Sequence, residues 1–324
     1  MQQRGVQAPA RGAVAPPSVG SLFVPTRVGG GAAPRPTVAA RTASLQRQPT
    51  ADGLVGLGGL VLPPSYAPAP AAKPVPVAAP SAVKPKLRLS WAGSGIYFWW
   101  QLGAVQYLAQ HFALSKVPMV GASGGGLAAV LAACDVPPEA VMESALAHSR
   151  KHNVWERPLG LMGTWGGLIE AWLDELLPAD AAERCSGQVG IVVTTLPRCD
   201  QVCIDAFTDK ADLINVAMAS AHVPLFLDWK MTRECRGVQC LDGSFPDFFA
   251  NDNCDLLKCG GDAVVFDYFF DPAIVRNGRF DMLTLKEFRE FKKIILLGYR
   301  YAQRLHEAGE FERFDLSDAL RARA

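Results

Sequence analysis

Ser123 lies at the centre of a Gly-x-Ser-x-Gly pattern, formed with Gly121 and Gly125, that could present a nucleophile. An apolar run, residues 117–120, precedes the pattern, and small and apolar residues, 127–134, follow it. A strand that turns directly into a helix strains the residue at the turn, and flanking glycines let the two elements approach. The helix also offers unpaired N–H groups and a positive dipole end. We therefore expect Ser123 to be a catalytic nucleophile; a glycine-rich turn with a bystander hydroxyl is the alternative.

Gly93, Ser94 and Gly95 form a second candidate loop, directly after the alternating, β-like residues 87–92. Positions without side chains let backbone N–H groups approach a bound oxyanion closely. Preorganised donors of this kind contribute about 3 kcal/mol each in acyl transfer. We expect this loop to stabilise the oxyanion that forms when the serine attacks an ester.

Asp242 and Gly243 follow a short predicted strand, 238–241, and offer a general base. Burial raises the pKa of a carboxyl group, which makes it a stronger base than a solvated aspartate. An Asp-Gly pair alone most often marks a turn. Among the five histidines, His222 is the one candidate for a Ser-His-Asp triad, with a structural role at a helix end as the alternative. We favour direct proton transfer from Ser123 to Asp242.

Strands that alternate with helices would position these loops. Hydrophobic periodicity and capping signals predict helices over 98–111, from about 138, over 208–221 and over 286–305, and strands over 87–92, 117–120, 190–195 and 238–241. This alternation predicts an α/β fold with a mostly parallel central sheet flanked by helices on both faces. In such sheets reactive groups gather beyond the carboxyl ends of the strands.

Residues 1–86 differ in composition from the rest of the chain. They hold 15 of the 24 prolines and nine basic residues, but one acid, Asp52. We expect this segment to be disordered, as a transit peptide for a plastid or other organelle or as a tethering tail, because its apolar density is too low to offset ordering entropy. Its start lacks the continuous apolar core of a secretory signal.

Charge and hydropathy in residues 87–324 exclude several classes of protein. Removing the leader from totals of 32 basic and 31 acidic residues leaves 23 and 30, and the basic residues are scattered, so we expect no nucleic-acid partner. The uncharged stretch between Arg88 and Lys116 is interrupted by glycine, serine and glutamine, which argues against a transmembrane span. The eight cysteines include two pairs at x4 spacing, which we expect to be reduced thiols more often than zinc ligands: Cys235/Cys240 and Cys254/Cys259.

Residues 87–305 resemble a patatin-like phospholipase domain, closer to the animal branch that includes adipose triglyceride lipase than to the plant storage proteins. The residues that carry the resemblance occur in the family's order: Gly93-x-Gly95 with Gly103, Gly121-Ala122-Ser123-Gly124-Gly125 with Leu127, Ala219-Ser220-Ala221-His222-Val223-Pro224-Leu225-Phe226, and Arg236-Gly237-Val238 leading to Leu241-Asp242-Gly243. Two positions depart from the usual pattern. Ile96, Tyr97 and Phe98 follow Gly95 where many members have a third glycine and a basic residue, and Ser244 follows Gly243 where glycine or alanine is common.

The resemblance implies a three-layer architecture, a Ser-Asp dyad and hydrolysis of lipid acyl esters through a covalent acyl-enzyme, without a metal or cofactor. Carried onto this chain, the implied site residues are Ser123 and Asp242 as the dyad, Gly93, Ser94 and Gly95 as the oxyanion loop, and Gly121, Gly124, Gly125 and Gly243 as supporting glycines. The implied domain spans 87–310, before a charged tail, 311–324. A catalytically silent lipid-binding protein and an α/β-hydrolase esterase that uses His222 are the alternatives.

Aromatic and large apolar residues flank both candidate loops. They are Tyr97, Phe98, Trp99 and Trp100 after the glycine loop, Phe245, Phe248 and Phe249 after the aspartate, and Leu161, Met162, Trp165 and Trp172 in the middle of the chain. Each alone is typical of core packing, but together they suit an acyl-chain cleft and an interfacial rim. We expect the partner to be a lipid substrate at a membrane or lipid-droplet surface, and the protein to be intracellular and peripheral to it.

Overall fold

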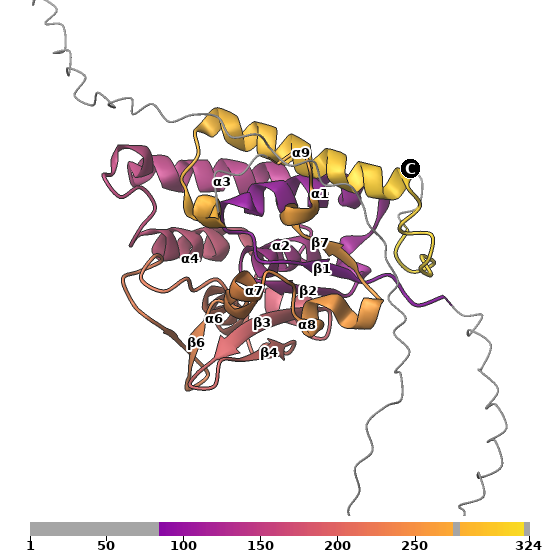
Figure 1. Ribbon diagram of the computed structural model, residues 1–324, viewed down its shortest axis with the longest axis horizontal. Coiled ribbons are helices and arrows are strands. Elements are labelled where there is room, and N and C mark those ends of the chain that lie inside the picture. The colour runs from indigo at the N-terminus through magenta and orange to yellow at the C-terminus, as the bar shows by residue number, and fades with distance from the viewer. Residues whose placement is uncertain (1–83, 275–278, 321–324) are drawn as a thin grey trace, which may run out of the picture. The chain divides into compact units, whose positions relative to one another are not determined.

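The computed structural model describes residues 84–274 and 279–320, and Figure 1 shows how their helices and strands are arranged. The prediction of a disordered leader, 1–86, falls almost entirely outside the described residues.

In the described part of the chain, seven strands form one mixed sheet with the order β5-β6-β3-β2-β1-β7, and β4 pairs with β3 beside this path. The strands are β1 (Leu89–Trp91), β2 (Met119–Ala122), β3 (Val189–Thr195), β4 (Asp200–Ile204), β5 (Arg233–Cys235), β6 (Val238–Leu241) and β7 (Val264–Phe266). Neighbours among β7, β1, β2 and β3 pair in parallel, whereas β4 and β6 run antiparallel to β3 and β5 antiparallel to β6. The predicted α/β fold with a mostly parallel sheet is confirmed. The parallel strands form the part of the sheet from β7 to β3, and the antiparallel strands pair with β3 or follow from it.

The α-helices of the described residues are α1 (Phe98–His111), α2 (Gly124–Ala133), α3 (Pro138–Lys151), α4 (Trp165–Leu176), α5 (Ala181–Cys185), α6 (Lys210–Ser220), α7 (Phe245–Ala250), α8 (Asp255–Lys258) and α9 (Phe288–Glu307). Helices α1, α3, α6 and α9 begin within two residues of the predicted starts and α2 follows Ser123 as predicted, whereas α4, α5, α7 and α8 had no predicted counterpart. Short 3-10 turns are η1 (Gly95–Tyr97), η2 (Leu114–Lys116), η3 (Val154–Glu156), η4 (Cys259–Gly261), η5 (Tyr268–Phe270) and η6 (Arg279–Leu283). Helix α3 begins with Pro138, which needs no N–H partner in a first turn. No helix in these described ranges is both long and apolar enough to span a bilayer.

Helices cover both faces of the sheet (Figure 1). Alternate residues of a strand point to opposite faces, and here both faces carry apolar side chains that pack against helices. Met119 and Ile191 belong to the large apolar cluster that includes residues of α1, α2 and α6. Ala122 and Val192 point to the other face, where Leu257 of α8 covers them. The result is a three-layer arrangement whose larger core lies on the α2 side.

Residues 311–320, predicted to be part of a charged tail, pack against the domain. Phe311 and Phe314 are buried in the large apolar cluster. The N–H of Asp315 donates to the carbonyl of Pro85 at 2.8 Å, which ties this segment to the chain just before β1. The packed region therefore continues past residue 310, where Ala319 is also buried and Leu316 packs against the same cluster.

Candidate active site

The carboxyl ends of β2 and β6 meet head to head beside β3. Strand β4 occupies one edge of β3 along its pairing from Ile191 to Thr195, so β2 and β6 share the other edge. Strand β2 pairs up to Val192, and β6 arrives from the opposite direction and pairs down to Thr194. The residues that follow these two strands, Ser123 and Asp242, are therefore brought together at the level between Val192 and Thr194. Asp242 was expected at the end of a strand in the parallel sheet, but β6 is antiparallel to β3, and this direction brings Asp242 to Ser123.

Ser123 occupies a tight turn between β2 and α2. Its backbone has φ 55° and ψ −131°, a conformation that side-chain-bearing residues rarely adopt and that surrounding packing must hold in place. Gly125 is required nearby, because a Cβ atom there would collide with the backbone carbonyl of Trp91. The turn places the Ser123 side chain at the N-terminus of α2, where the helix dipole favours negative charge.

The Ser123 and Asp242 side chains are hydrogen bonded. The Ser123 hydroxyl donates to Oδ2 of Asp242 at 2.7 Å. Ser123 is 6% exposed and Asp242 is 3% exposed, so bulk water competes little for this contact. The geometry is that of a hydroxyl ready to pass its proton to a carboxylate.

Burial raises the pKa of Asp242 above that of an ordinary aspartate, and the nearby charge of Asp247 adds to this effect. Hydrogen bonds oppose it, because they stabilise the carboxylate: one from the Ser123 hydroxyl, and two to Oδ1 from the Ser244 hydroxyl at 2.7 Å and the Ser244 N–H at 2.8 Å. Since burial is the largest contribution, Asp242 is a stronger base than a solvated aspartate.

Ser220, at the end of α6, joins the three segments that build the site. Its buried hydroxyl donates to the carbonyl of Val192 at 2.6 Å and accepts the N–H of Ser123 at 2.8 Å. Its carbonyl accepts the N–H of Gly243 at 2.8 Å. Ser220 belongs to the segment that resembles the family's motif, but a serine in a helical pattern carries no sequence signature of such a bridge.

The glycine loop lies against the start of α2. Gly93 is packed between Ser123 and Ser244, and Gly124 is packed against Ser94 and Gly95, which leaves no room for a Cβ atom on Gly93 or Gly124. No acceptor for the backbone N–H groups of Gly95 and Gly124 is found among the described residues. These two N–H groups therefore remain available to an oxyanion near the Ser123 hydroxyl.

Gln101 of α1 supports the glycine loop through two hydrogen bonds. Its Oε1 accepts the Ser94 hydroxyl at 2.8 Å, and its Nε2 donates to the carbonyl of Ala92 at 2.7 Å. Both side chains are fully buried or nearly so. The Ser94 hydroxyl is thus engaged by Gln101 and holds the glycine loop in place, and the loop can offer backbone N–H groups, but not this hydroxyl, to another group.

His222 lies close to the site in sequence but points elsewhere. Its Nε2 contacts the carbonyl of Lys230 at 3.3 Å, and its Nδ1 is buried without a partner among the described residues. Burial lowers its pKa, so the ring is held neutral. Only its backbone carbonyl reaches Asp242, whose N–H it accepts at 2.9 Å. The hydroxyl of Ser123 is bonded to the aspartate, not to this ring.

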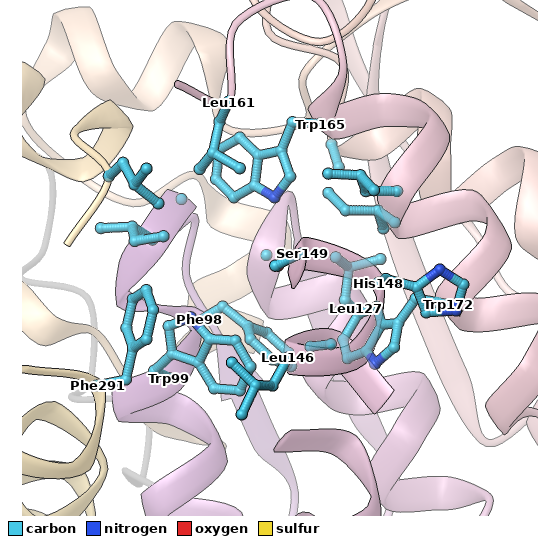
Figure 2. A pocket seen from close by; sticks show the side chains of 18 of the residues that line it. Phe98, Trp99, Leu127, Leu146, His148, Ser149, Leu161, Trp165, Trp172 and Phe291 are labelled. Carbon is cyan, nitrogen blue, oxygen red and sulfur yellow. The ribbon is translucent and has the colours of Figure 1, made fainter. Parts of the chain in front are cut away.

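A large apolar cavity opens beside Ser123. The unfilled space among its lining residues, open solvent at the mouth included, is about 1030 Å³. Figure 2 shows Phe98, Trp99 and Phe291 on one side, with Leu161 and Trp165 across from them. The described side chains that line it include no carboxylate, lysine or arginine. Such a cavity suits a hydrocarbon chain.

The predicted aromatic residues divide between cavity, core and surface. Phe98, Trp99, Trp165 and Trp172 line the cavity together with Leu161. Tyr97 and Trp100 are core residues: Tyr97 stacks on Tyr268, and Trp100 packs against the tilted ring of Tyr301. The three phenylalanines of α7 lie outside the cavity, and the Phe249 side chain is 64% exposed.

The cysteines of both predicted pairs, Cys235/Cys240 and Cys254/Cys259, are free thiols. Within residues 84–274 and 279–320, no three His, Cys, Asp or Glu side chains are placed to share a metal ion.

Comparison with known proteins gives a family match over the same region. The family model described as "Patatin-like phospholipase" matches residues 89–256, more than half of the 324 residues. Among curated proteins, the chain is 27% identical over 165 residues to mouse (Mus musculus) "1-acylglycerol-3-phosphate O-acyltransferase Pnpla3", which covers 49% of this chain and 39% of that protein. It is 27% identical over 163 residues to human (Homo sapiens) "Omega-hydroxyceramide transacylase", covering 48% and 30%, and 28% identical over 170 residues to mouse "Patatin-like phospholipase domain-containing protein 2", covering 50% and 34%. The matched region spans about a third of the length of these curated relatives.

Proposed function

The chain belongs to the patatin-like phospholipase family, and from this premise we propose that it is a lipid acyl hydrolase that uses Ser123 as nucleophile and Asp242 as base. The observation that carries the proposal is the buried hydrogen bond of 2.7 Å from the Ser123 hydroxyl to Asp242. Two of the similar proteins are named for acyl transfer, an acyltransferase and a transacylase, which supports chemistry at an acyl ester.

The first step is attack on an ester carbonyl. Asp242 takes the hydroxyl proton of Ser123 as the serine oxygen bonds to the carbonyl carbon, and a tetrahedral oxyanion forms. The N–H groups of Gly95 and Gly124, for which no backbone acceptor is found among the described residues, and the N-terminus of α2 would stabilise this negative charge. Asp242 then returns the proton to the leaving alcohol, and the acyl group stays on the serine.

The second step releases the acyl group. Asp242 takes a proton from water, the resulting nucleophile attacks the acyl-enzyme, and the proton returns to Ser123 as the free acid leaves. An alcohol in place of water would give acyl transfer by the same residues. Product analysis therefore distinguishes hydrolysis from transfer.

The surroundings of the dyad support a lipid as the acyl donor. The apolar cavity beside Ser123 can hold an acyl chain. Helix α7 begins immediately after Ser244, and Phe248 on this helix contacts the exposed rings of Phe249 and Phe280. These three rings form the phenylalanine cluster (Phe248, Phe249, Phe280), which suits contact with a membrane or droplet surface close to the site.

A fluorophosphonate probe tests the serine. We expect it to label the wild-type protein and Ser90→Ala, but not Ser123→Ala. Ser90 is a buried serine of β1 whose hydroxyl has no partner among the described residues, so it controls for loss of any buried hydroxyl. No labelling of a folded wild-type protein would favour a catalytically silent lipid-binding protein, and equal labelling of Ser123→Ala and wild type would move the nucleophile to another residue.

The same preparations test the substrate class. Phosphatidylcholine vesicles, galactolipid vesicles and triacylglycerol emulsions should yield free fatty acid with wild-type protein. Good activity on short soluble esters alone, with none on any of these three lipids, would contradict the lipid assignment.

A further inference from the structure

We propose that Ser244 is a positioning residue that fixes the rotation of the Asp242 carboxylate and stabilises its anionic form. The inference rests on the function proposed above. It begins from the position where this chain has serine after the Asp-Gly pair.

Both donors of Ser244 are used on one oxygen of the aspartate. The Ser244 hydroxyl donates to Oδ1 at 2.7 Å and its N–H donates to the same atom at 2.8 Å. The other oxygen, Oδ2, accepts the Ser123 hydroxyl at 2.7 Å. With Oδ1 held by two donors, the carboxylate plane is fixed and Oδ2 is aimed at Ser123. An alanine or glycine here would keep the N–H contact and lose the hydroxyl.

The Ser244 side chain does not make the helix-capping contact that is usual at its position. Ser244 is the N-cap residue of α7, a position where serine normally accepts an N–H of the first turn through its side-chain oxygen. Here no such cap is formed, and the hydroxyl hydrogen goes to the aspartate instead.

Packing confines the hydroxyl to this arrangement. Ser244 lies directly against Gly93, at a distance that a side chain on residue 93 would not permit. The glycine loop therefore closes one side of the serine and the aspartate closes the other. The same contact couples the oxyanion loop to the base.

The charge near Asp242 explains why such a donor matters. The charge of Asp247 of α7 acts on Asp242, and a second negative charge nearby opposes its ionisation. The Asp247 carboxylate accepts the amide of Gln201 at 2.8 Å, and burial raises its own pKa. Ser244 offsets both the burial of Asp242 and this like charge.

The decisive experiment measures the titration of Asp242 directly. Full-length protein is labelled with ¹³C at the aspartate carboxyl carbons, and the Asp242 resonance is identified by its loss in Asp242→Asn. We expect the midpoint in Ser244→Ala to lie about one pH unit above that of wild type, the size expected for losing one hydrogen bond to a charged group. Ser90→Ala should leave it unchanged, and Asp247→Asn should lower it.

The pH dependence of kcat/KM on a soluble ester gives the second reading. The acidic limb should move upward in Ser244→Ala with the NMR midpoint, while thermal unfolding shows the variant folded. Coincident Asp242 midpoints in wild type and Ser244→Ala would overturn the inference, even if Ser123→Ala and Asp242→Asn were inactive. If the Asp242 midpoint shifts in Ser244→Ala but the wild-type protein has no esterase activity, the role of Ser244 is supported and the proposed function is contradicted.

Discussion

The hydroxyl of Ser123 meets Oδ2 of Asp242 at 2.7 Å although the strands that precede them run in opposite directions. Both strands pair with the same edge of β3, and their ends face each other there. Strand β3 therefore positions both residues, and the hydroxyl of Ser220, which donates to the carbonyl of Val192 on β3 and accepts the N–H of Ser123, links the turn at Ser123 to this strand.

Replacing the base should abolish most activity while replacing the nearby histidine should not. In Asp242→Asn we expect kcat to fall by about 10²- to 10⁴-fold, the usual contribution of a general base. His222→Gln can still donate to the Lys230 carbonyl and should keep at least about a tenth of wild-type kcat. Steady-state hydrolysis of a soluble ester measures both. A larger loss in His222→Gln than in Asp242→Asn would point to a histidine-dependent triad.

The same Asp242→Asn variant should be more stable than wild type near neutral pH. Burial raises the pKa of Asp242 in the folded state, so between its unfolded and folded pKa values the folded state binds more protons. Stability then falls as pH rises through that window, and asparagine escapes this loss because it does not ionise. Chemical unfolding at several pH values should show a gain that fades below about pH 4, near the pKa of an unfolded aspartate. A gain that is the same at all pH values would contradict this account.

Removing the Ser220 hydroxyl should loosen the nucleophile turn. Ser220→Ala leaves the buried N–H of Ser123 without its acceptor, which should cost about 1–3 kcal/mol of unfolding free energy. We expect kcat to fall about tenfold with little change in KM, because the hydroxyl of Ser123 is less well aligned. The matched control is Ser90→Ala, a buried serine without partners among the described residues, which should change neither quantity much. Equal effects of the two substitutions would remove Ser220 from the site.

Filling the cavity should change chain-length preference. Ala145 of α3 lines the cavity, whereas Ala147 on the same helix is exposed. Ala145→Phe should lower kcat/KM for a long-chain ester by at least about tenfold relative to an acetate ester, since the added ring occupies space needed by the chain. Ala147→Phe should leave the ratio unchanged. An unchanged ratio in the folded Ala145→Phe variant would place the acyl chain elsewhere.

The phenylalanine cluster should matter only at a lipid surface. Phe249 and Phe280 are 64% and 66% exposed, so replacing both with serine should cost little stability. We expect lower activity on vesicles and emulsions, with unchanged kcat/KM on a soluble ester. Val202→Ser, on the exposed side of β4, controls for loss of a surface apolar group. Equal loss on soluble and surface substrates would indicate damage to the site rather than to surface contact.

Local signals in the sequence were sufficient to place the loops that form the site. The helix over 98–111 and the strand over 238–241 begin and end where they were predicted. The strand before Ser123 and the helix after it were also foreseen, because apolar runs, glycines and prolines act within a few residues.

Relations between distant segments were not accessible in this way. A strand pattern carries no direction, so the antiparallel approach of β6 was missed. Most residues of strand β4 are half-exposed, so its apolar alternation is weak. Strand β5 is three residues long, which is too short to show a clear alternation. Helix α4 was missed although its apolar side chains line the cavity, since its start, Gly166-Gly167, favours a loop.

The distance of 119 residues between Ser123 and Asp242 also has a consequence for synthesis. A chain still on the ribosome carries its serine well before the aspartate has been made, and the strand that delivers the aspartate can dock only on an edge already built. On the proposed mechanism, an incomplete polypeptide ending before residue 238 is inert toward the membranes around it, and lipolysis requires that β6 and the aspartate after it have been made.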